Sequence, residues 1–438
     1  MTTLTVGAQQ QFHRIADAVA AARDGDVVLV QAGTYVNDFA TVTHRITLQG
    51  AGGMVKMVAT VAPTNGKAIL TTASDVTVDH FAFSGAKVAD QNGAGIRYDS
   101  GNLTVTNSYF QDNENGLLAA ADAQGTITIR NSEFGHNGNG NGATHNIYVG
   151  AVERLTIQDS YIHNAVVGHE IKSRALNTVI TGSRIQNNGG NGSYEIDLPQ
   201  GGNALIQGNL IQQGAKASNF TLIAFGEEGN PNSGPALVVR GNTVVNDKTG
   251  SIIPSDAPVA VWNATDTPAA MEDNRIYGLG STAKTFGPVA QTGTAALASR
   301  PALSLASPIG SSVHSVALNL SEDYWLGDAQ AIISIDGKQV SGTQSITAPH
   351  ALNQEQTISF LVPLSAGPHT ASVAFVNDAW GGTAATDRNL YIDSMDVNAQ
   401  HVVLGATLYA NGVLSFAIPP DALSVGNAAN ALAVLPSR

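Results

Sequence analysis

The stretch LTVTNSYFQDN (103–113) decides the fold, because close variants of it recur along the chain up to about residue 280. The variants are VTVDHFAFSG (76–85), ITIRNSEFGHN (127–137), LTIQDSYIHN (155–164), VITGSRIQNN (179–188), LIQGNLIQQG (205–214) and VVRGNTVVND (238–247). In one common register an apolar residue falls at Val78, Val105, Ile129, Ile157, Ile180, Ile206, Val239 and Met271. A second follows five residues later in every repeat, at Phe83, Phe110, Phe134, Ile162, Ile185, Ile211, Val244 and Ile276.

Each repeat combines a strand of alternating β-branched residues, a polar turn, a second short strand and a variable loop. A unit of this kind cannot bury its apolar face alone, so successive units must stack on one another. The pattern therefore predicts a right-handed parallel β-helix. Recurrent Asn residues at the turn (Asn107, Asn131, Asn209 and Asn242) fit two roles, a stacked polar ladder inside the helix or simple turn formation.

The beginning of the chain supports this prediction. The segment FHRIADAVAAARDGDVVLVQAGTYV (12–36) predicts an amphipathic helix with Ile15, Ala18, Val19 and Ala22 on one face, followed by an apolar strand. It resembles the N-terminal cap of the pectate-lyase-like β-helix superfamily. In that superfamily such a helix covers the open end of the solenoid, where unpaired strand edges would otherwise promote association.

Further along the chain, the repeat fades and a different pattern begins. We expect the β-helix to occupy residues 1–290 and a linker to occupy residues 291–311, which are rich in Ala, Ser and Pro. After it, alternating strands separated by turn residues predict an antiparallel β-sandwich over residues 312–438. The predicted class is all-β throughout.

Composition excludes several kinds of protein. The chain has 438 residues, no cysteine and a formal net charge of −13, so disulfides, thiolate metal sites and nucleic-acid binding are not expected. No apolar run is long enough to cross a membrane. The first residues, MTTLTVGAQQQ, lack the pattern of a cleavable signal peptide, yet the acidic, Gly-rich composition suits a secreted, calcium-associated bacterial protein. The oligomeric state is not fixed by the sequence.

Two blocks of the C-terminal part carry a second resemblance. The blocks LNLSEDYWLGDAQAIISIDGKQVSGTQSITAPH (318–350) and FVNDAWGGTAATDRNLYID (375–393) resemble the calcium-dependent xylan-binding modules of carbohydrate-binding families 36 and 60. The resemblance implies that Ca²⁺ binds sugar hydroxyls directly, because this ion accepts six to eight oxygen ligands. It makes Asp378, Asp387, the Trp380 carbonyl and Glu322 the metal ligands, with Trp380, Trp325 or Tyr324 beside the sugar.

Charged residues gather in one part of the β-helix. Only 13% of the chain is charged, against roughly 25% in ordinary proteins, yet GHEIKSR (168–174) and SYEIDLP (193–199) hold five charges between them. Together with HNIYVG (145–150) they align as strands of three successive coils about 4.8 Å apart. Alternation predicts that Asn146, Glu170 and Glu195 form one outward column and that Tyr148, Lys172 and Asp197 form the next, beside Arg174.

Three interpretations fit this cluster. A polysaccharide lyase would use Lys172 as the base and Arg174, or calcium on Asn146, Glu170 and Glu195, to neutralise a uronate. A glycoside hydrolase would use Glu170 and Glu195, since carboxylates on adjacent coils approach the spacing of about 5–5.5 Å in retaining enzymes. The third interpretation is a structural charge ladder that pairs with itself. His169 is a candidate acid or base beside the carboxylates.

The block from Glu170 to Gly202 loosely resembles polysaccharide lyase family 6. Lys172, Ser173 and Asn177 match the Lys-Ser and the downstream Asn of that family. The next strand departs from it, because Glu195-Ile196-Asp197 stands where the family has an Arg. The departure removes the second catalytic cation of that type of lyase.

The sequence as a whole predicts an extracellular protein that binds and cleaves a polysaccharide, by elimination or hydrolysis, with a calcium-dependent carbohydrate-binding module. The alternative is a matrix protein or adhesin, in which the β-helix is a spacer and only the C-terminal module binds sugar. Neither the glycan nor its charge follows from the sequence.

Overall fold

The computed structural model of the chain describes residues 2–229, 231–234, 236–248, 258–279, 285–305, 307–308, 311–365, 369–397 and 400–419. The chain divides into two compact units, one made of residues 1–50 and 54–309 and the other of residues 51–53 and 310–438. Among the described residues, no helix combines the length and the apolar character needed to cross a bilayer.

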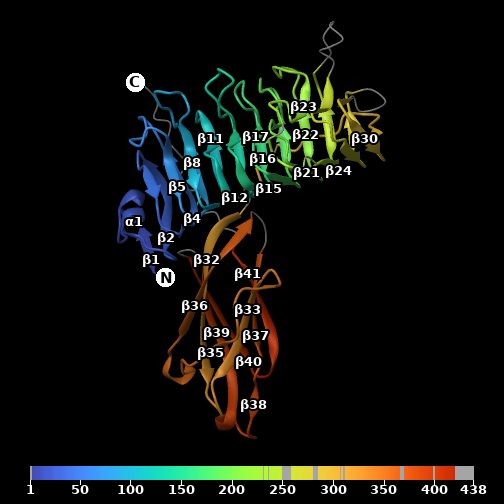
Figure 1. Cartoon of the computed structure of the whole chain (residues 1–438). Coiled ribbons are helices and arrows are strands. Elements are labelled where there is room, and N and C mark those ends of the chain that lie inside the picture. Colours follow the sequence, from blue (N-terminus) through green and yellow to red (C-terminus); the bar gives the residue numbers. More distant parts are fainter. Residues whose placement is uncertain are drawn as a thin grey trace, which may run out of the picture. The chain divides into compact units, whose positions relative to one another are not determined.

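The first unit is a parallel β-helix in which each regular coil contributes three strands (Figure 1). One strand per coil enters a ten-stranded parallel sheet, which we call the outer sheet. Its members are β3 (Ala40–Val42), β5 (Ala68–Ala73), β8 (Ala94–Ser100), β11 (Asn115–Ala119), β14 (Ile147–Val149), β17 (Ile171–Ser173), β20 (Ile196–Leu198), β23 (Thr221–Phe225), β26 (Val259–Asn263) and β29 (Thr285–Phe286).

The other strands form two further parallel stacks. The first holds β1 (Thr3–Val6), β2 (Val27–Val36), β4 (Ile46–Val58), β6 (Val76–Asp79), β9 (Asn102–Thr106), β12 (Asp122–Arg130), β15 (Val152–Gln158), β18 (Asn177–Thr181), β21 (Asn203–Gln207), β24 (Ala236–Arg240), β27 (Ala269–Glu272) and β30 (Val289–Thr292). The second holds β7 (Phe81–Ser84), β10 (Tyr109–Gln111), β13 (Glu133–Gly135), β16 (Tyr161–His163), β19 (Arg184–Gln186), β22 (Leu210–Gln213), β25 (Thr243–Asn246), β28 (Arg275–Tyr277) and β31 (Ala295–Ala296).

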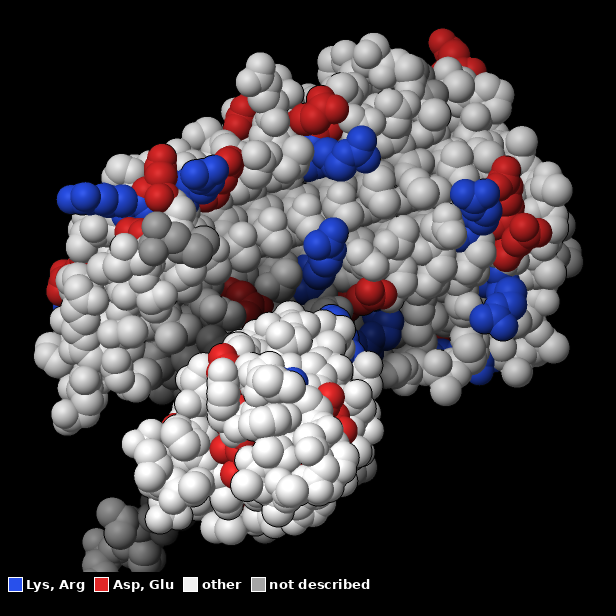
Figure 2. All heavy atoms as spheres, turned by 90° about the horizontal axis from the view of Figure 1, so that it is seen from below, with Lys and Arg blue, Asp and Glu red and all other residues white. Residues whose placement is uncertain are grey.

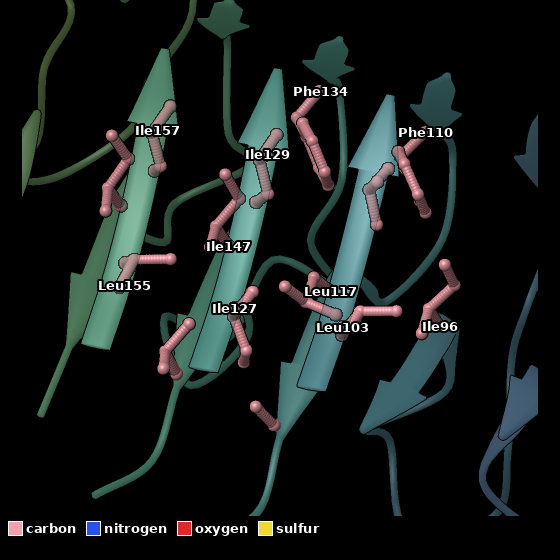
Figure 3. Close-up of a cluster of buried hydrophobic side chains, with 14 of the residues drawn as sticks. Ile96, Leu103, Phe110, Leu117, Ile127, Ile129, Phe134, Ile147, Leu155 and Ile157 are labelled. Atoms are coloured by element: carbon pink, nitrogen blue, oxygen red, sulfur yellow. The ribbon is translucent and has the colours of Figure 1, made fainter. Parts of the chain in front are cut away.

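The two apolar columns of the repeat are confirmed residue by residue. Val105 pairs with Ile129, and Ile129 pairs with Ile157. The second column runs in the same way, and the rings of Phe110 and Phe134 stack with centroids 4.2 Å apart. These side chains are buried inside the coils (Figure 3). Like residues of successive coils therefore lie directly above one another, and this regular stacking forms the core.

A hydrogen-bonded ladder runs through the corner between the strands of these two stacks. One buried Ser or Asn per coil accepts the backbone N–H of its equivalent in the preceding coil, and the members are Ser108, Ser132, Ser160, Ser183, Asn209, Asn242 and Asn274. The residue before each member has a positive φ, as at Asn107 (48°), Asn131 (46°) and Gly241 (62°). The two roles predicted for the turn Asn residues thus both occur, at adjacent positions.

The N-terminal helix is confirmed as a cap. Helix α1 (Ile15–Ala21) buries Ile15, Ala18 and Val19 against the end of the coils. Its first backbone N–H groups have no side-chain cap within the helix, so Asp38 supplies one from a distant turn. The Asp38 carboxylate accepts hydrogen bonds from Ile15 N at 2.6 Å and Ala16 N at 3.1 Å. This interaction ties the helix to the coil that it covers.

At the other end, pairing continues into the stretch for which the sequence predicts a linker. Strand β30 pairs with β27, and β31 pairs with β28. Beyond them, Arg184 donates to the carbonyl of Ser304 at 2.8 Å, so this segment contacts the outside of the coils.

The second unit is an antiparallel β-sandwich (Figure 1). One sheet contains β36 (Gln356–Ser365), β32 (Ser311–Asp323), β39 (Asp387–Val397), β38 (Ala379–Trp380) and β40 (Gln400–Leu408). The other contains β34 (Lys338–Gln339), β33 (Ala329–Ile335), β35 (Gln344–Ile346), β37 (His369–Phe375) and β41 (Gly412–Ile418). Two 3₁₀ turns, η2 (His350–Leu352) and η3 (Ala384–Thr386), lie in the connections. Buried aliphatic residues and Phe375 fill the space between the sheets.

The ladder makes the first testable prediction. Asn242 Nδ2 donates to the carbonyl of Ile206 and its Oδ1 accepts Asn209 N, so Asn242→Ala leaves buried groups unpaired. We expect a loss of about 1–3 kcal/mol in the free energy of unfolding, measured by urea denaturation. The matched control is Gly241→Asn, which places at a positive φ the residue that other coils carry there and meets no atom within 4 Å. Equal losses in both variants would contradict a stabilising ladder.

Candidate active site

Strands β14, β17 and β20 align in the register that the sequence predicts. Ile147 pairs with Ile171 and Ile171 with Ile196, all three inside the coils. On the opposite side of the sheet, Tyr148 pairs with Lys172 and Lys172 with Asp197. The outward column of Tyr148, Lys172 and Asp197 is therefore present. It lies on the outer sheet near the middle of the coil stack.

The other predicted outward column is wrong. Asn146, Glu170 and Glu195 lie above one another, but their exposed fractions are 0%, 1% and 0%. Each of these residues comes just before its strand begins, at a corner of the coil, where the alternation of strand side chains does not apply. The corner turns the three side chains inward, and they join the interior hydrogen bonds.

The buried side chains of this column form hydrogen bonds with protein groups inside the coils. Asn137 Nδ2 donates to Asn146 Oδ1 at 2.8 Å, and Asn146 Nδ2 donates to Glu170 Oε2 at 2.5 Å. Glu170 also accepts the N–H of Ala165. Burial raises the pKa of Glu170 to about 8, and burial together with Glu170 raises the pKa of Glu195. At neutral pH the Glu170 carboxyl group is therefore largely protonated.

These facts remove two of the predicted roles. A buried carboxyl group bonded to interior amides cannot reach a glycosidic bond, so Glu170 and Glu195 do not form a hydrolase pair on the surface. They also do not hold calcium with Asn146 as an exposed carboxylate set. Among the described residues, no group of three or more His, Asp or Glu side chains has the spacing of a metal site.

A compact ionic network occupies the outer face instead. Lys172 Nζ lies 2.8 Å from Asp197 Oδ2 and 3.0 Å from Glu228 Oε1. Arg174 Nη2 lies 2.5 Å from Glu228 Oε2, and its Nη1 donates to Tyr148 Oη at 2.6 Å. Burial alone would lower the pKa of Lys172, but Asp197 and Glu228 outweigh it and the pKa is raised. Lys172 is thus an ammonium ion at neutral pH, which argues against the predicted role as a base.

Two stacked histidines border this network. His145 and His169 lie 4.7 Å apart between ring centroids, and Tyr194 continues the stack at 4.9 Å from His169. Each imidazole accepts a backbone N–H at Nδ1, from His169 and Tyr194 respectively, so the ring proton of each neutral imidazole is on Nε2. Burial, with the nearby cations, lowers the pKa of both, to about 3 for His145.

The stack is connected to the network through one carboxylate. His169 Nε2 lies 3.3 Å from Asp197 Oδ2, the same oxygen that binds Lys172. The Nε2–H of His169 therefore faces the Asp197 carboxylate. Glu227 is on the loop after β23, and burial together with the neighbouring Asp197 raises its pKa.

Sequence reasoning missed Glu227, Glu228 and Tyr194. The signal for the first two is visible in GEEGN (226–230), where two adjacent acids stand between glycines in a chain poor in charge. Both residues follow β23, which pairs with β20, so the alignment of successive coils also brings them close to Lys172 and Asp197. Elsewhere on the β-helix charges are sparse, and acidic and basic side chains lie near each other on the face in Figure 2.

The C-terminal unit places several of its predicted residues together. Strand pairing sets Trp380 directly opposite Asp387, and Trp380 is 61% exposed. Asp378 precedes this pair and its backbone N–H donates to Asn411. Its Oδ1 atom is buried and has no hydrogen-bond partner among the described residues. An unpartnered buried carboxylate oxygen on Asp378 fits a cation ligand, so the residues present are compatible with Ca²⁺.

Glu322, the fourth predicted ligand, has a structural contact of its own. Its carboxylate is buried and accepts the N–H of Ala329 at 2.5 Å, which closes the loop that holds Tyr324 and Trp325. Glu322, Asp378 and Asp387 do not converge as a metal site in the described part of the chain. The buried Arg388 links the loops by donating to the carbonyls of Trp325 and Asn377.

Comparison with known families separates the two units. Residues 96–276 match the family described as a right-handed β-helix region. Residues 315–407 match the family described as a Ca-dependent, xylan-binding carbohydrate-binding module, CBM60. One unit of the chain is thus similar to right-handed β-helix regions, and the other is similar to carbohydrate-binding modules of family 60. Both family resemblances predicted from the sequence are confirmed, and each match covers less than half of the chain.

Solved structures overlap with the same two units. An alginate lyase from Paenibacillus sp. str. FPU-7 is 18% identical over 67% of this chain and 99% of its own, with a TM-score of 0.43. The pectate lyase Pel9A is 14% identical over 70% of this chain and 82% of its own, with a TM-score of 0.41. A calcium-dependent module, vCBM60, is 20% identical over 24% and 89%, with a TM-score of 0.18. A search of curated proteins found no match.

The buried Glu170 predicts an unusual pH dependence of stability. Its folded pKa of about 8 lies above the ordinary value of 4.5, so the folded state keeps a proton that the unfolded chain loses. The stabilisation that this proton gives to the folded state is fully present below the ordinary pKa of 4.5. It is lost as the pH rises through the pKa of Glu170 in the folded state. We expect the unfolding temperature of the β-helix to fall between about pH 5 and pH 8, and to fall less in Glu170→Gln. An unchanged slope in that variant, with exposed Glu272→Gln as the control, would contradict the assignment.

Proposed function

We propose that the β-helix is a polysaccharide lyase that acts on a uronate-containing glycan, and that the C-terminal module attaches it to polysaccharide through Ca²⁺. This is an extracellular activity, since long glycan chains of this kind lie outside the cell. The observation that carries the proposal is the outward cluster of Tyr148, Lys172 and Arg174 on adjacent coils.

The cations supply the first requirement of β-elimination. Removing the proton beside a carboxylate builds negative charge on that carboxylate, and a cation must neutralise it. Lys172 and Arg174 lie on the same side of the outer sheet and already share one carboxylate, Glu228. Both have partly exposed side chains, at 12% and 17%. A sugar carboxylate has the same geometry and charge as the group that they hold.

Tyr148 supplies the second requirement, a base. Its Oη accepts a hydrogen bond from Arg174 Nη1 at 2.6 Å, and this charged donor holds the oxygen in the cluster. In the proposed step the deprotonated Tyr148 oxygen takes the C5 proton, and the electron pair of that C–H bond forms the C4–C5 double bond. The bond from C4 to the bridging oxygen breaks, and the oxygen leaves as a hydroxyl after accepting a proton from the Lys172 ammonium.

In this proposal the C-terminal module attaches the protein to the polysaccharide. Asp378, Asp387 and the carbonyl of Trp380 would hold Ca²⁺, which supplies open coordination positions to sugar hydroxyls. The exposed Trp380 and Tyr324 rings offer apolar faces for sugar rings. Arg388 fixes the loops that carry them.

A non-catalytic alternative has one observation in its favour. Each cation of the cluster has a protein carboxylate within ion-pair distance, so the network is satisfied without any substrate. In that case the β-helix is a rigid spacer, and the protein is an adhesin whose C-terminal module alone binds sugar.

The lyase proposal predicts a specific product. Incubation with alginate, pectate and glucuronoxylan is expected to generate the absorbance of unsaturated uronate with at least one of them. Tyr148→Phe and Lys172→Ala are expected to lose about 10²-fold or more of that rate, since each removes a proton-transfer group. Lys216→Ala, an exposed lysine outside the cluster, is the control. New reducing ends without unsaturated product would contradict elimination, and no product of either kind would favour the adhesin.

The calcium proposal is tested separately on immobilised xylan. Retention of the chain is expected to require Ca²⁺ and to be lost in Asp378→Asn, because one carboxylate ligand is removed. Asp336→Asn is the control, since Asp336 lies on another turn and pairs with His369. Retention that persists after chelation, or in Asp378→Asn, would contradict this ligand assignment.

A further inference from the structure

Lys172 and Arg174 converge on a single carboxylate that comes from a distant part of the chain. Glu228 lies more than fifty residues later, on the loop after β23, two coils away from β17. Its two oxygens are divided between the cations, with Oε1 on Lys172 at 3.0 Å and Oε2 on Arg174 at 2.5 Å. One carboxylate therefore bridges the two groups.

The backbone and the side chain of Glu228 differ in how firmly they are held. The backbone N–H bonds the carbonyl of Pro199, and the flanking turn is closed by the bond from Gly229 N to Gly226 O. The side chain is 42% exposed and has no other ion pair in the described part of the chain. Its ion pairs join a 42% exposed carboxylate to cations that are 12% and 17% exposed, so water reaches these pairs from the carboxylate side and weakens them. The carboxylate can leave while the loop stays in place.

When the Glu228 carboxylate moves away, Lys172 and Arg174 each keep one other protein contact. Lys172 keeps its contact with Asp197, which is buried, and Arg174 keeps its bond to Tyr148. The raised pKa of Glu227 keeps that neighbour uncharged, so it offers no second anion in place of Glu228. What remains is a preformed position for one incoming carboxylate, with an excess of positive charge.

From this geometry we propose that Glu228 is a specificity-determining residue that occupies the carboxylate position of the site and is exchanged for the carboxylate of a uronate sugar. The proposal rests on the proposed function, because it assumes that this face binds glycan. A uronate restores both ion pairs when it displaces Glu228. A neutral sugar offers no anion and leaves Glu228 bound, so it is excluded.

Removing Glu228 is therefore expected to tighten binding of acidic glycans. We would measure the affinity of saturated oligouronates derived from alginate and pectate by calorimetry, with xylohexaose as the neutral probe. Chelator is present so that calcium-dependent binding by the C-terminal module is absent. Glu228→Ala and Glu228→Gln should bind the oligouronate about fivefold more tightly or better than the wild type, with a steeper loss of affinity at high salt. Xylohexaose should not gain affinity to the same extent.

The matched control is Glu272→Ala, which removes an equally exposed glutamate paired with Arg240 on another coil. It should leave oligouronate affinity unchanged. Suppose that the wild type binds the oligouronate, that Lys172→Ala abolishes this binding, and that Glu228→Ala leaves it unchanged or weakens it. This result would overturn the exchange of Glu228 and leave the proposed function standing. If no oligouronate binds to the wild type or to Glu228→Ala, both the exchange and the proposed function are overturned.

Discussion

Hydrogen bonds between equivalent residues of successive coils hold the rest of the β-helix in register. The Ser and Asn ladder joins each corner to the next, so one coil cannot slip relative to its neighbour without leaving buried N–H groups unpaired. Apolar columns provide most of the burial, but a shift by two residues would still bring apolar residues together, as Leu103 and Val105 stand two positions apart. The polar ladder does not tolerate such a shift, and it thereby fixes which outward side chains become neighbours.

The outward cluster around Lys172 depends on that register. Tyr148, Lys172 and Asp197 meet because their strands align one residue to one residue, and Arg174 reaches back to Tyr148 from the end of its strand. The same stacking places Glu170 and Glu195 in the interior, where burial raises their pKa values. One column of a coil stack can thus carry the Lys172 ammonium on the outer face while the adjacent column holds carboxyl groups of raised pKa inside.

Strand periodicity in the sequence predicts the fold, both apolar columns, the helical cap and the outward column containing Lys172. It fails at Asn146, Glu170 and Glu195, because alternation is a property of strands and these residues stand at corners. It also fails to find Glu228, whose role depends on a loop that follows its strand and folds back toward Lys172. In the C-terminal module, motif resemblance predicts Asp378, Asp387 and Glu322 as metal ligands, and strand periodicity gives no signal for them; one Glu322 oxygen accepts a backbone N–H.

The central claim is that the outer sheet presents a carboxylate-binding cluster to an acidic glycan. A crystal structure of Tyr148→Phe with an oligouronate bound tests it most directly, because that variant is expected to bind without cleaving. The account predicts a sugar carboxylate between Lys172 and Arg174, with Glu228 moved away and Glu170 still buried. A sugar bound only to the C-terminal module, with Glu228 still bridging the two cations, would contradict it.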